Sequence, residues 1–410
     1  MPDRKRLERI KTALIALLTA SALALLYLAF AQQGAALLRS GPSAEPETAA
    51  YADGPLPVAV VVTNENAERF SAAYDAAAVS AVLDEAAPLL AAALSTAGRP
   101  VPAGSAAWRS ALSGHSIFFD YAACVPLTAL AGWLGASCEL DGSARWLVLA
   151  CEDGGAALYF SDGARVLRCS TGVRNPELTA RTGGFAPNGA RFPFELDAPG
   201  LLTDFGVLPA ETPLLETVRV KNPFRTGLDP ENLLSAFGMN RFVANSYLEA
   251  DGARVYIDGS CSLRIGADGL VQFLQTGASV LSVGDMTPAG VIAAARQLLT
   301  ACTQPLGGQA ALRFSGLTES PSGRSFAVYF DYVLDGVLLY RPDGAAAEIT
   351  VTDGVITSAR IQFCEYEQAG HSETPLPPAQ AAAVVSVTGG TPLLVYEHDQ
   401  ERVSARWVAS

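Results

Sequence analysis

The sequence predicts an α+β protein with antiparallel sheets, preceded by a single transmembrane helix. Three observations support this fold class. An apolar run near the start is long enough to cross a bilayer, short strand patterns are joined by Asp-Gly turns, and a helix preceding such strands occurs twice. The length of 410 residues then suggests two or three α+β modules beyond the membrane.

The N-terminus combines a basic flank with an apolar segment. Residues 1–12 carry five basic and two acidic residues, and residues 13–31 are almost wholly apolar. A helix over 13–31 would span roughly 28 Å, close to the hydrocarbon thickness of a bilayer. The basic flank should stay in the cytoplasm, so we expect a single-pass cell-membrane protein whose C-terminal domains are extracellular. The alternative is a cleaved signal peptide, because Ala29-Phe30-Ala31 resembles a cleavage site.

One face of the predicted transmembrane helix carries small residues. Ala16, Ala20 and Ala24 recur every four residues, and Thr19 lies beside them. Such a stripe lets a second helix approach closely, and threonine can add an interhelical hydrogen bond. These four residues are therefore candidates for contact with a partner helix, although an alanine-rich chain also produces such stripes by chance.

The composition limits the function classes. The chain carries 28 basic and 41 acidic residues, a net charge of −13, which becomes −16 without the N-terminal flank. Such an acidic ectodomain argues against nucleic acid as a partner. Seven cysteines without a CxxC pair form no metal or redox motif, and their odd number leaves at least one thiol free or paired between chains.

Composition shifts divide the exported part. Residues 32–57 are rich in Pro, Ser, Gly and Glu and are expected to be a linker. Three α+β modules should follow at 58–200, 201–284 and 285–410. In each of the last two modules a helix precedes a β-meander, which predicts antiparallel sheets.

Helix caps support this division. In the first module Asn64 can cap a long alanine-rich helix. In the second, Asp229 precedes Pro230 at the start of a short helix pattern, and in the third Thr287 precedes Pro288 in the same way. The Asp-Gly pairs that follow, such as Asp335-Gly336, lack the spacing of a calcium loop and are expected to be hairpin turns.

No catalytic constellation is visible in the sequence. The three histidines are His115, His371 and His398, and none belongs to an HExxH motif. There is also no GxSxG nucleophile motif and no Gly-rich phosphate loop. We therefore expect no catalytic residue, no cofactor and no metal ligand.

Several segments resemble the YycH family of membrane-anchored accessory regulators, which are related to YycI. The basic tail and single anchor are similar to the start of that family. The segment beginning DPENLLSAFG resembles its "LF" helix, which a Tyr-x-x-x-Gly hairpin follows. The segment SFAVYFDYVLDGVLLY and the closing LLVYEHDQERVSARWVA resemble its last, PepSY-like module. The chain departs from the family in its Ala/Arg bias and in a Gly/Pro-rich insertion around 181–200.

The resemblance implies a role without enzymatic activity. The protein would contact the WalK (also YycG) sensor histidine kinase through its membrane helix and ectodomain, often together with a YycI-like partner. By binding one kinase state better than the other, it would shift the kinase population and so influence cell-wall metabolism.

Two other classes remain open. The ectodomain could bind peptides or cell-wall fragments in an aromatic-lined cleft, or it could be an exported enzyme assembled from distant residues. A buried acid or histidine with a perturbed pKa in a pocket would favour the enzyme. An exposed apolar patch near a sheet edge would favour the regulator.

Overall fold

The computed structural model describes the chain from residue 54 to its end, apart from residues 55, 197–202, 243, 278–280, 305, 307, 388–389 and 400–401. The predicted membrane span at 13–31 lies outside the described residues, as do the basic tail at 1–12 and most of the linker at 32–57. The predicted helix-contact residues also lie outside them, namely Ala16, Thr19, Ala20 and Ala24. All of these stay predictions.

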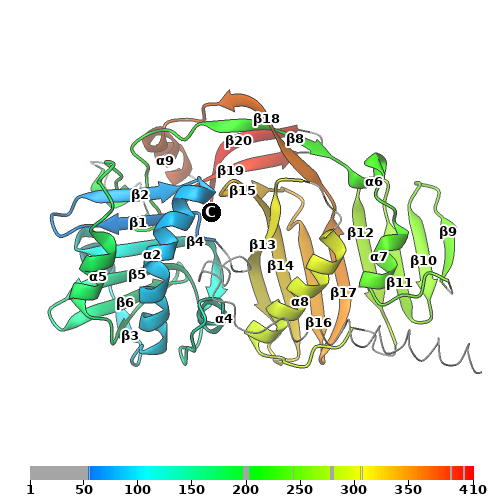
Figure 1. Cartoon of the computed structure of the whole chain (residues 1–410), viewed down its shortest axis with the longest axis horizontal. Coiled ribbons are helices and arrows are strands. Elements are labelled where there is room, and N and C mark those ends of the chain that lie inside the picture. The colour runs from blue at the N-terminus through cyan, green and yellow to red at the C-terminus, as the bar shows by residue number, and fades with distance from the viewer. Residues whose placement is uncertain are drawn as a thin grey trace, which may run out of the picture. The chain divides into compact units, whose positions relative to one another are not determined.

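An antiparallel sheet forms the N-terminal part of the described chain (Figure 1). Its strands are β1 (Ala59–Thr63), β2 (Arg69–Ala73), β3 (Val101–Ala103), β4 (Ser116–Pro126), β5 (Ser143–Glu152), β6 (Gly155–Ser161) and β7 (Val166–Ser170). They follow the spatial order β2-β1-β4-β5-β6-β7-β3. The accompanying helices are α2 (Ala76–Ser95), α3 (Ser105–Ser113), α4 (Leu127–Trp133) and α5 (Asn175–Thr182), and the 3-10 helix η2 covers Pro193–Glu195.

Both faces of this sheet are covered, so its central strands are apolar throughout. Val60 and Val62 of β1 pack in the cluster that contains α2 and α4, whereas Val61 packs in the cluster that contains α3. On the α3 side, the Trp108 ring lies edge-on to Phe118 of β4 at 6.5 Å between ring centroids. The sheet is therefore the middle of three layers.

The helix α2 begins later than the sequence predicts. Its N-cap is Asp75, whose side chain accepts a hydrogen bond from the Ala78 N–H at 2.9 Å, and not Asn64. The Asn64 side chain instead accepts hydrogen bonds from the N–H groups of Asn66 and Glu68, each at 2.9 Å. It holds the turn between β1 and β2, because the chain forms a second strand before the helix starts.

The helix α2 is long and apolar enough to cross a membrane, by length and composition alone. This is weak support for a membrane span, because a helix in the core of a soluble domain passes the same test. One side of α2 packs on the sheet through Leu83, Leu90 and Leu94, which are all almost fully buried. Its apolar residues therefore belong to the core of the N-terminal part.

A helix followed by four antiparallel strands occurs twice in the next part of the chain. The first set is α7 (Glu231–Ala236) with β9 (Asn245–Leu248), β10 (Arg254–Asp258), β11 (Cys261–Ile265) and β12 (Leu270–Gln275). The second set is α8 (Pro288–Thr303) with β13 (Ala311–Glu319), β14 (Ser325–Leu334), β16 (Ala347–Thr352) and β17 (Val355–Gln362). The last strands of the two sets pair antiparallel, with Gln272 opposite Arg360. Both sets thus share one sheet, and α7 and α8 lie on the same face of it (Figure 1).

The remaining elements extend this sheet and bridge it to the N-terminal part. They are β8 (Leu215–Lys221), α6 (Pro223–Thr226), β15 (Val337–Tyr340), β18 (Glu365–Glu373), α9 (Pro378–Ser386), β19 (Pro392–Asp399) and β20 (Arg402–Ala409). The strand β15 pairs parallel with β19, β19 forms a hairpin with β20, and β18 pairs with β8 in a separate ribbon. A second core cluster fills the space among these elements, and Tyr74 and Trp407 meet edge-on in it at 5.7 Å.

The predicted α+β class with antiparallel sheets is confirmed, with β15–β19 as a parallel pair. The Thr287 cap is also confirmed, since its hydroxyl accepts from the Gly290 N–H at 3.2 Å. Asp335 and Gly336 form the predicted turn, and both have positive φ, 49° and 79°, as a two-residue hairpin requires. The module boundaries and the PepSY-like character of the last module stay predictions, although strands from 201–284 and 285–410 share one sheet.

The shared sheet provides a stability test at two neighbouring residues. Phe273 of β12 is buried and stacks on Phe237 at 4.8 Å between ring centroids, whereas Leu274 is 50% exposed on the opposite face. We expect Phe273→Ala to lower the free energy of unfolding by about 3–5 kcal/mol. Leu274→Ala should lower it by less than about 1 kcal/mol. Guanidinium unfolding of the full chain, followed by tryptophan fluorescence, measures both, and equal losses would contradict the described strand orientation.

Candidate functional site

The three histidines, for which the sequence predicts no common site, lie in three different environments. His115 precedes β4 and lies beside α5, and His398 lies in β19 among buried residues. His371 is exposed on β18, where its Nδ1–H donates to the Ala369 carbonyl at 3.1 Å. Only His115 and His398 have neighbours that could take part in chemistry.

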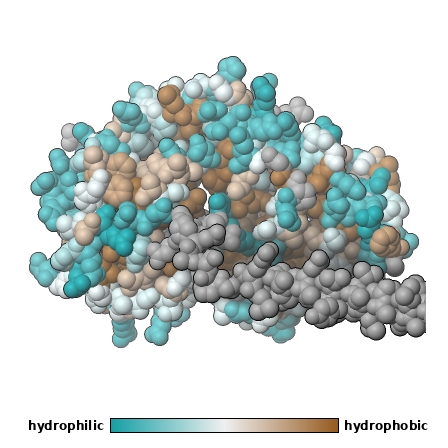
Figure 2. All heavy atoms as spheres, in the orientation of Figure 1, coloured by the Kyte–Doolittle hydropathy of each residue, from teal (hydrophilic) through white to brown (hydrophobic). Residues whose placement is uncertain are grey.

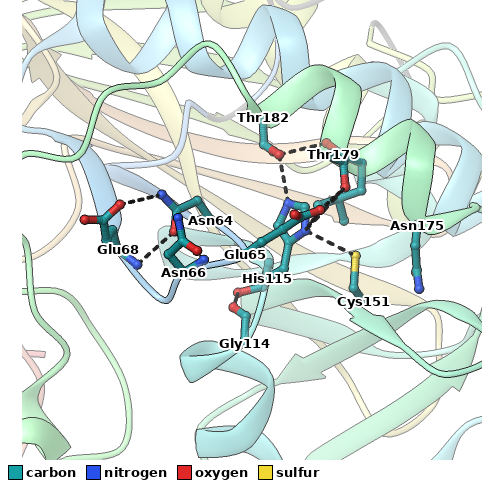
Figure 3. Close-up of polar contacts among 12 residues, drawn as sticks. Asn64, Glu65, Asn66, Glu68, Gly114, His115, Cys151, Asn175, Thr179 and Thr182 are labelled. Atoms are coloured by element: carbon teal, nitrogen blue, oxygen red, sulfur yellow. Dashed lines mark hydrogen bonds and ion pairs between the residues drawn. The ribbon is translucent and has the colours of Figure 1, made fainter.

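His115 brings together side chains from three elements (Figure 3). Its Nε2 lies 2.9 Å from the hydroxyl of Thr182, and its Nδ1 lies 3.5 Å from the hydroxyl of Thr179, both on α5. The Nδ1 also lies 3.7 Å from Cys151 Sγ on β5 and 3.9 Å from Glu65 Oε1 in the β1–β2 turn. A thiol next to an imidazole is the arrangement that a cysteine nucleophile needs.

The hydrogen bonds around His115 define its tautomer. The Thr182 hydroxyl donates to the Leu178 carbonyl at 2.8 Å, so it accepts from His115 Nε2–H. In the neutral ring this leaves Nδ1 as an acceptor. The Thr179 hydroxyl donates to Glu65 at 3.2 Å, so the Cys151 thiol is the donor that Nδ1 can accept. The pair is therefore a neutral thiol bonded to a neutral imidazole.

Burial keeps this pair in its neutral form. Desolvation and, as the smaller cause, the nearby Glu65 carboxylate together raise the pKa of Cys151 to about 11. Desolvation also lowers the pKa of His115, although Glu65 opposes that shift. Reactive cysteines have a lowered pKa and an adjacent cation. Together with the His115–Thr182 hydrogen bond, the pair thus links β5 to α5, and it lacks the electrostatics of an activated nucleophile.

Metal and disulfide chemistry receive no support from the part of the chain that the structure describes. Within that part, no group of three or more His, Cys, Asp or Glu side chains could hold a metal ion. All seven cysteines lie in it and all seven thiols are free. Burial raises the pKa of Cys302 to about 12 and also raises the pKa of Cys364, as expected for small apolar core residues.

A second polar group lines a hollow of about 920 Å³ that we call the basal hollow, bounded by β8, α6, the ends of β12 and β17, and the β19–β20 hairpin. Among its lining residues, His398 Nδ1 lies 2.8 Å from the Tyr366 hydroxyl and 3.2 Å from Arg341 Nη1. Arg341 also donates to Asp343 through Nε at 3.1 Å and Nη2 at 2.8 Å. Because a guanidinium can only donate, His398 Nδ1 accepts and the neutral ring carries its proton on Nε2.

The third feature is a set of exposed apolar residues on and near β9, the edge strand of the shared sheet. We call these five residues the edge patch: Phe242 before β9, Tyr247 and Leu248 on β9, Ile257 on β10, and Leu274 on β12, three strands in from the edge. The strand register places Tyr247, Ile257 and Leu274 on one face of the sheet and Leu248 on the other. Phe242 is 87% exposed and Leu248 is 67% exposed, and Figure 2 shows hydrophobic surface among hydrophilic residues at this end of the sheet. The strand β9 pairs with β10, and among the described residues no strand pairs with its outer edge. Open edges of this kind are templates for another chain.

Neither the basal hollow nor the edge patch is predicted from the sequence. The hollow combines residues between 220 and 402 whose pairing no local pattern reveals. The edge patch does have a local signal, since Tyr247 and Leu248 are apolar in a short strand beside a Phe242 that no helix buries. That signal becomes meaningful only when the order of strands is known.

Comparison of the chain with family models, with curated proteins and with solved structures found no match.

The neutral Cys151–His115 pair predicts slow thiol chemistry. At pH 7 a thiol with a pKa of about 11 is deprotonated about 300-fold less often than a free cysteine with a pKa of about 8.5. We expect iodoacetamide to label Cys151 at least about 100-fold more slowly than an unstructured cysteine peptide. The rate should rise about tenfold per pH unit toward pH 11, whereas labelling of the peptide levels off near pH 8.5.

Peptide mass spectrometry of the full chain measures this labelling. Glu65→Gln removes a carboxylate that raises the pKa of Cys151, so this variant should be labelled faster at each pH below 11. Labelling of Cys151 at pH 7 as fast as the peptide would contradict the raised pKa of this thiol, and labelling faster than the peptide would show an activated thiol and favour the enzyme class.

Proposed function

We propose that this chain is an extracytoplasmic, membrane-anchored regulator of a WalK-type sensor histidine kinase, and that it acts through protein–protein contact. The proposal includes a cytoplasmic N-terminus, a single membrane helix at 13–31 and a role in cell-wall metabolism. It also includes a YycI-like protein as a further partner, and a PepSY-like last module. The resemblance to the YycH family motivates these details.

The edge patch is the observation that supports protein–protein contact as the mode of action. The outer strands of the two joined four-strand sets, β13 and β9, differ in their surroundings. At one end, β13 contacts β4 of the N-terminal part, and Phe314 packs on Trp133 at 5.8 Å between ring centroids. At the other end, Tyr247 and Leu248 of β9 are more than half exposed. Exposed apolar groups beside an open strand edge favour a partner that covers both.

The binding energy available from this surface is adequate for regulation. Burial of one large apolar side chain contributes about 1.5–3 kcal/mol, so two such residues could change the affinity for a kinase state by about 100-fold or more. Regulation requires only that one kinase state be bound better than the other, and typical couplings are about 1–3 kcal/mol.

The edge patch can be tested with charged substitutions. We expect the double variant Tyr247→Lys with Leu248→Lys to recover at least about fivefold less sensor kinase in a crosslinking pull-down from the native membrane. Lysines on an edge strand block pairing with another chain, and they also remove the apolar contact. The matched control is Leu214→Lys, since Leu214 is 71% exposed but lies outside the edge patch. Equal recovery from both variants would exclude the edge patch as the contact surface.

A second experiment tests the membrane helix. Residues 1–31 are exchanged for an unrelated single-pass anchor of the same orientation, and the pull-down is repeated. We expect reduced kinase recovery, because the stripe of Ala16, Ala20 and Ala24 with Thr19 is lost. Unchanged recovery would place the contact in the ectodomain alone. Absence of a kinase from the native sample as well would overturn the regulator proposal.

A further inference from the structure

The charged residues that line the basal hollow form two groups, which differ in whether they are paired within the protein. In the first group, which we call the inner layer for its pairing and not for its depth, each cation has a partner: Arg341 is paired with Asp343, and Lys221 donates to Glu367 at 2.7 Å. The charges of this layer are neutralised within the protein. The volume of the hollow, about 920 Å³, is within the usual range of roughly 300–1,000 Å³ for small-molecule sites.

The outer layer of the hollow consists of charged groups without an ionic partner. The guanidiniums of Arg225 and Arg402 form no ion pair or hydrogen bond with any described residue. The Asp399 carboxylate is also without a partner in the described chain, although it stands opposite Arg402 in the hairpin. The Asp268 carboxylate accepts a hydrogen bond from the Leu270 N–H at 3.0 Å but no ion pair. Among the described residues that line the hollow, two positive and two negative groups are therefore without an ionic partner.

This balance decides which ligand chemistry fits. A purely anionic ligand would be attracted by the two arginines and repelled by the two carboxylates to a similar degree. A ligand that carries a carboxylate and an ammonium group can satisfy both signs at once, and arginine binds carboxylates with two parallel hydrogen bonds. We propose that the basal hollow binds a small zwitterion, namely a short peptide with free termini.

Buried side chains behind Arg341 and His398 give this site a fixed wall. Tyr366 and Arg341 both hold His398, and the Tyr366 and Tyr332 rings pack at 5.0 Å between centroids. The Tyr332 hydroxyl donates to the Gln362 carbonyl at 3.1 Å. Side chains that are fixed by packing and by hydrogen bonds need little reorganisation when a ligand arrives. The carboxylate of the peptide is assigned to Arg225 and Arg402, and its ammonium group to Asp268 and Asp399.

The proposal does not depend on the kinase contact, because none of the five edge-patch residues lines the hollow. It is tested by isothermal titration calorimetry on the full chain in detergent. The probes are trialanine, N-acetyl-trialanine, trialanine amide and inorganic phosphate. We expect trialanine to bind with millimolar or tighter affinity, and each capped peptide to bind at least about tenfold more weakly because one charged contact is lost.

Three variants assign the binding to the hollow. Arg402→Gln should weaken trialanine at least about tenfold but leave the affinity for trialanine amide nearly unchanged. Asp399→Asn should show the converse pattern, with N-acetyl-trialanine nearly unaffected. The control is Arg99→Gln, an exposed arginine outside the hollow, and it should bind like the native chain. Since each capped peptide reports on one charge, misfolding would weaken all probes together and is recognised by that pattern.

Each contrary outcome overturns the proposal. Phosphate that binds as tightly as trialanine would show a simple anion site. If capped and free peptides bind with equal affinity, the charged groups of the outer layer do not contribute to peptide binding. Lack of trialanine binding by the native chain would remove the site.

Discussion

The pairing of β12 with β17 is the constraint on which the rest of the structure depends. It joins two separate helix-and-meander sets through their last strands, with Gln272 opposite Arg360. The first strands of the two sets, β9 and β13, must then lie at the outer ends of the joined strands. The helices α7 and α8 must share one face, because a slip of one residue would turn every buried side chain to the other side. The position of the exposed edge patch therefore follows from this pairing.

Local signals predicted local structure well, and they failed where distant strands meet. The Thr287 cap and the Asp335-Gly336 turn were predicted because each depends on two or three neighbouring residues. Asn64 was interpreted as a helix cap because Arg69–Ala73 carries no clear strand pattern, so the hairpin before α2 was missed. The basal hollow could not be predicted, since Arg225 and Arg402 are brought together only by the pairing of β8, β18, β19 and β20.

The two histidine environments show how burial decides chemistry. Around His115, desolvation is the largest influence on both the imidazole and the Cys151 thiol, and it favours their neutral forms. Proximity of 3.7 Å is therefore insufficient to make a nucleophile. Around His398 the neighbouring side chains keep their charges. Arg341 has a carboxylate partner in Asp343, and the outer-layer residues of the hollow are exposed to solvent. Polar contacts of similar length thus have a structural role in one place and line a prospective binding site in the other.

The hollow and the edge patch lie on different strands, far enough apart to act separately. Asp268 occupies the turn before β12, and Leu274 lies six residues further along the chain, which corresponds to about 20 Å in a strand. Substitutions separated by more than about 7–10 Å usually have additive effects. Coupling between a bound peptide and a docked partner would need an element with two arrangements, and a continuous hydrogen-bonded sheet resists such rearrangement. If the effects of Asp399→Asn and Leu248→Lys on the free energies of peptide and partner binding are additive, the two sites are independent and lie on one rigid sheet. Non-additive effects would place a movable element between the two sites.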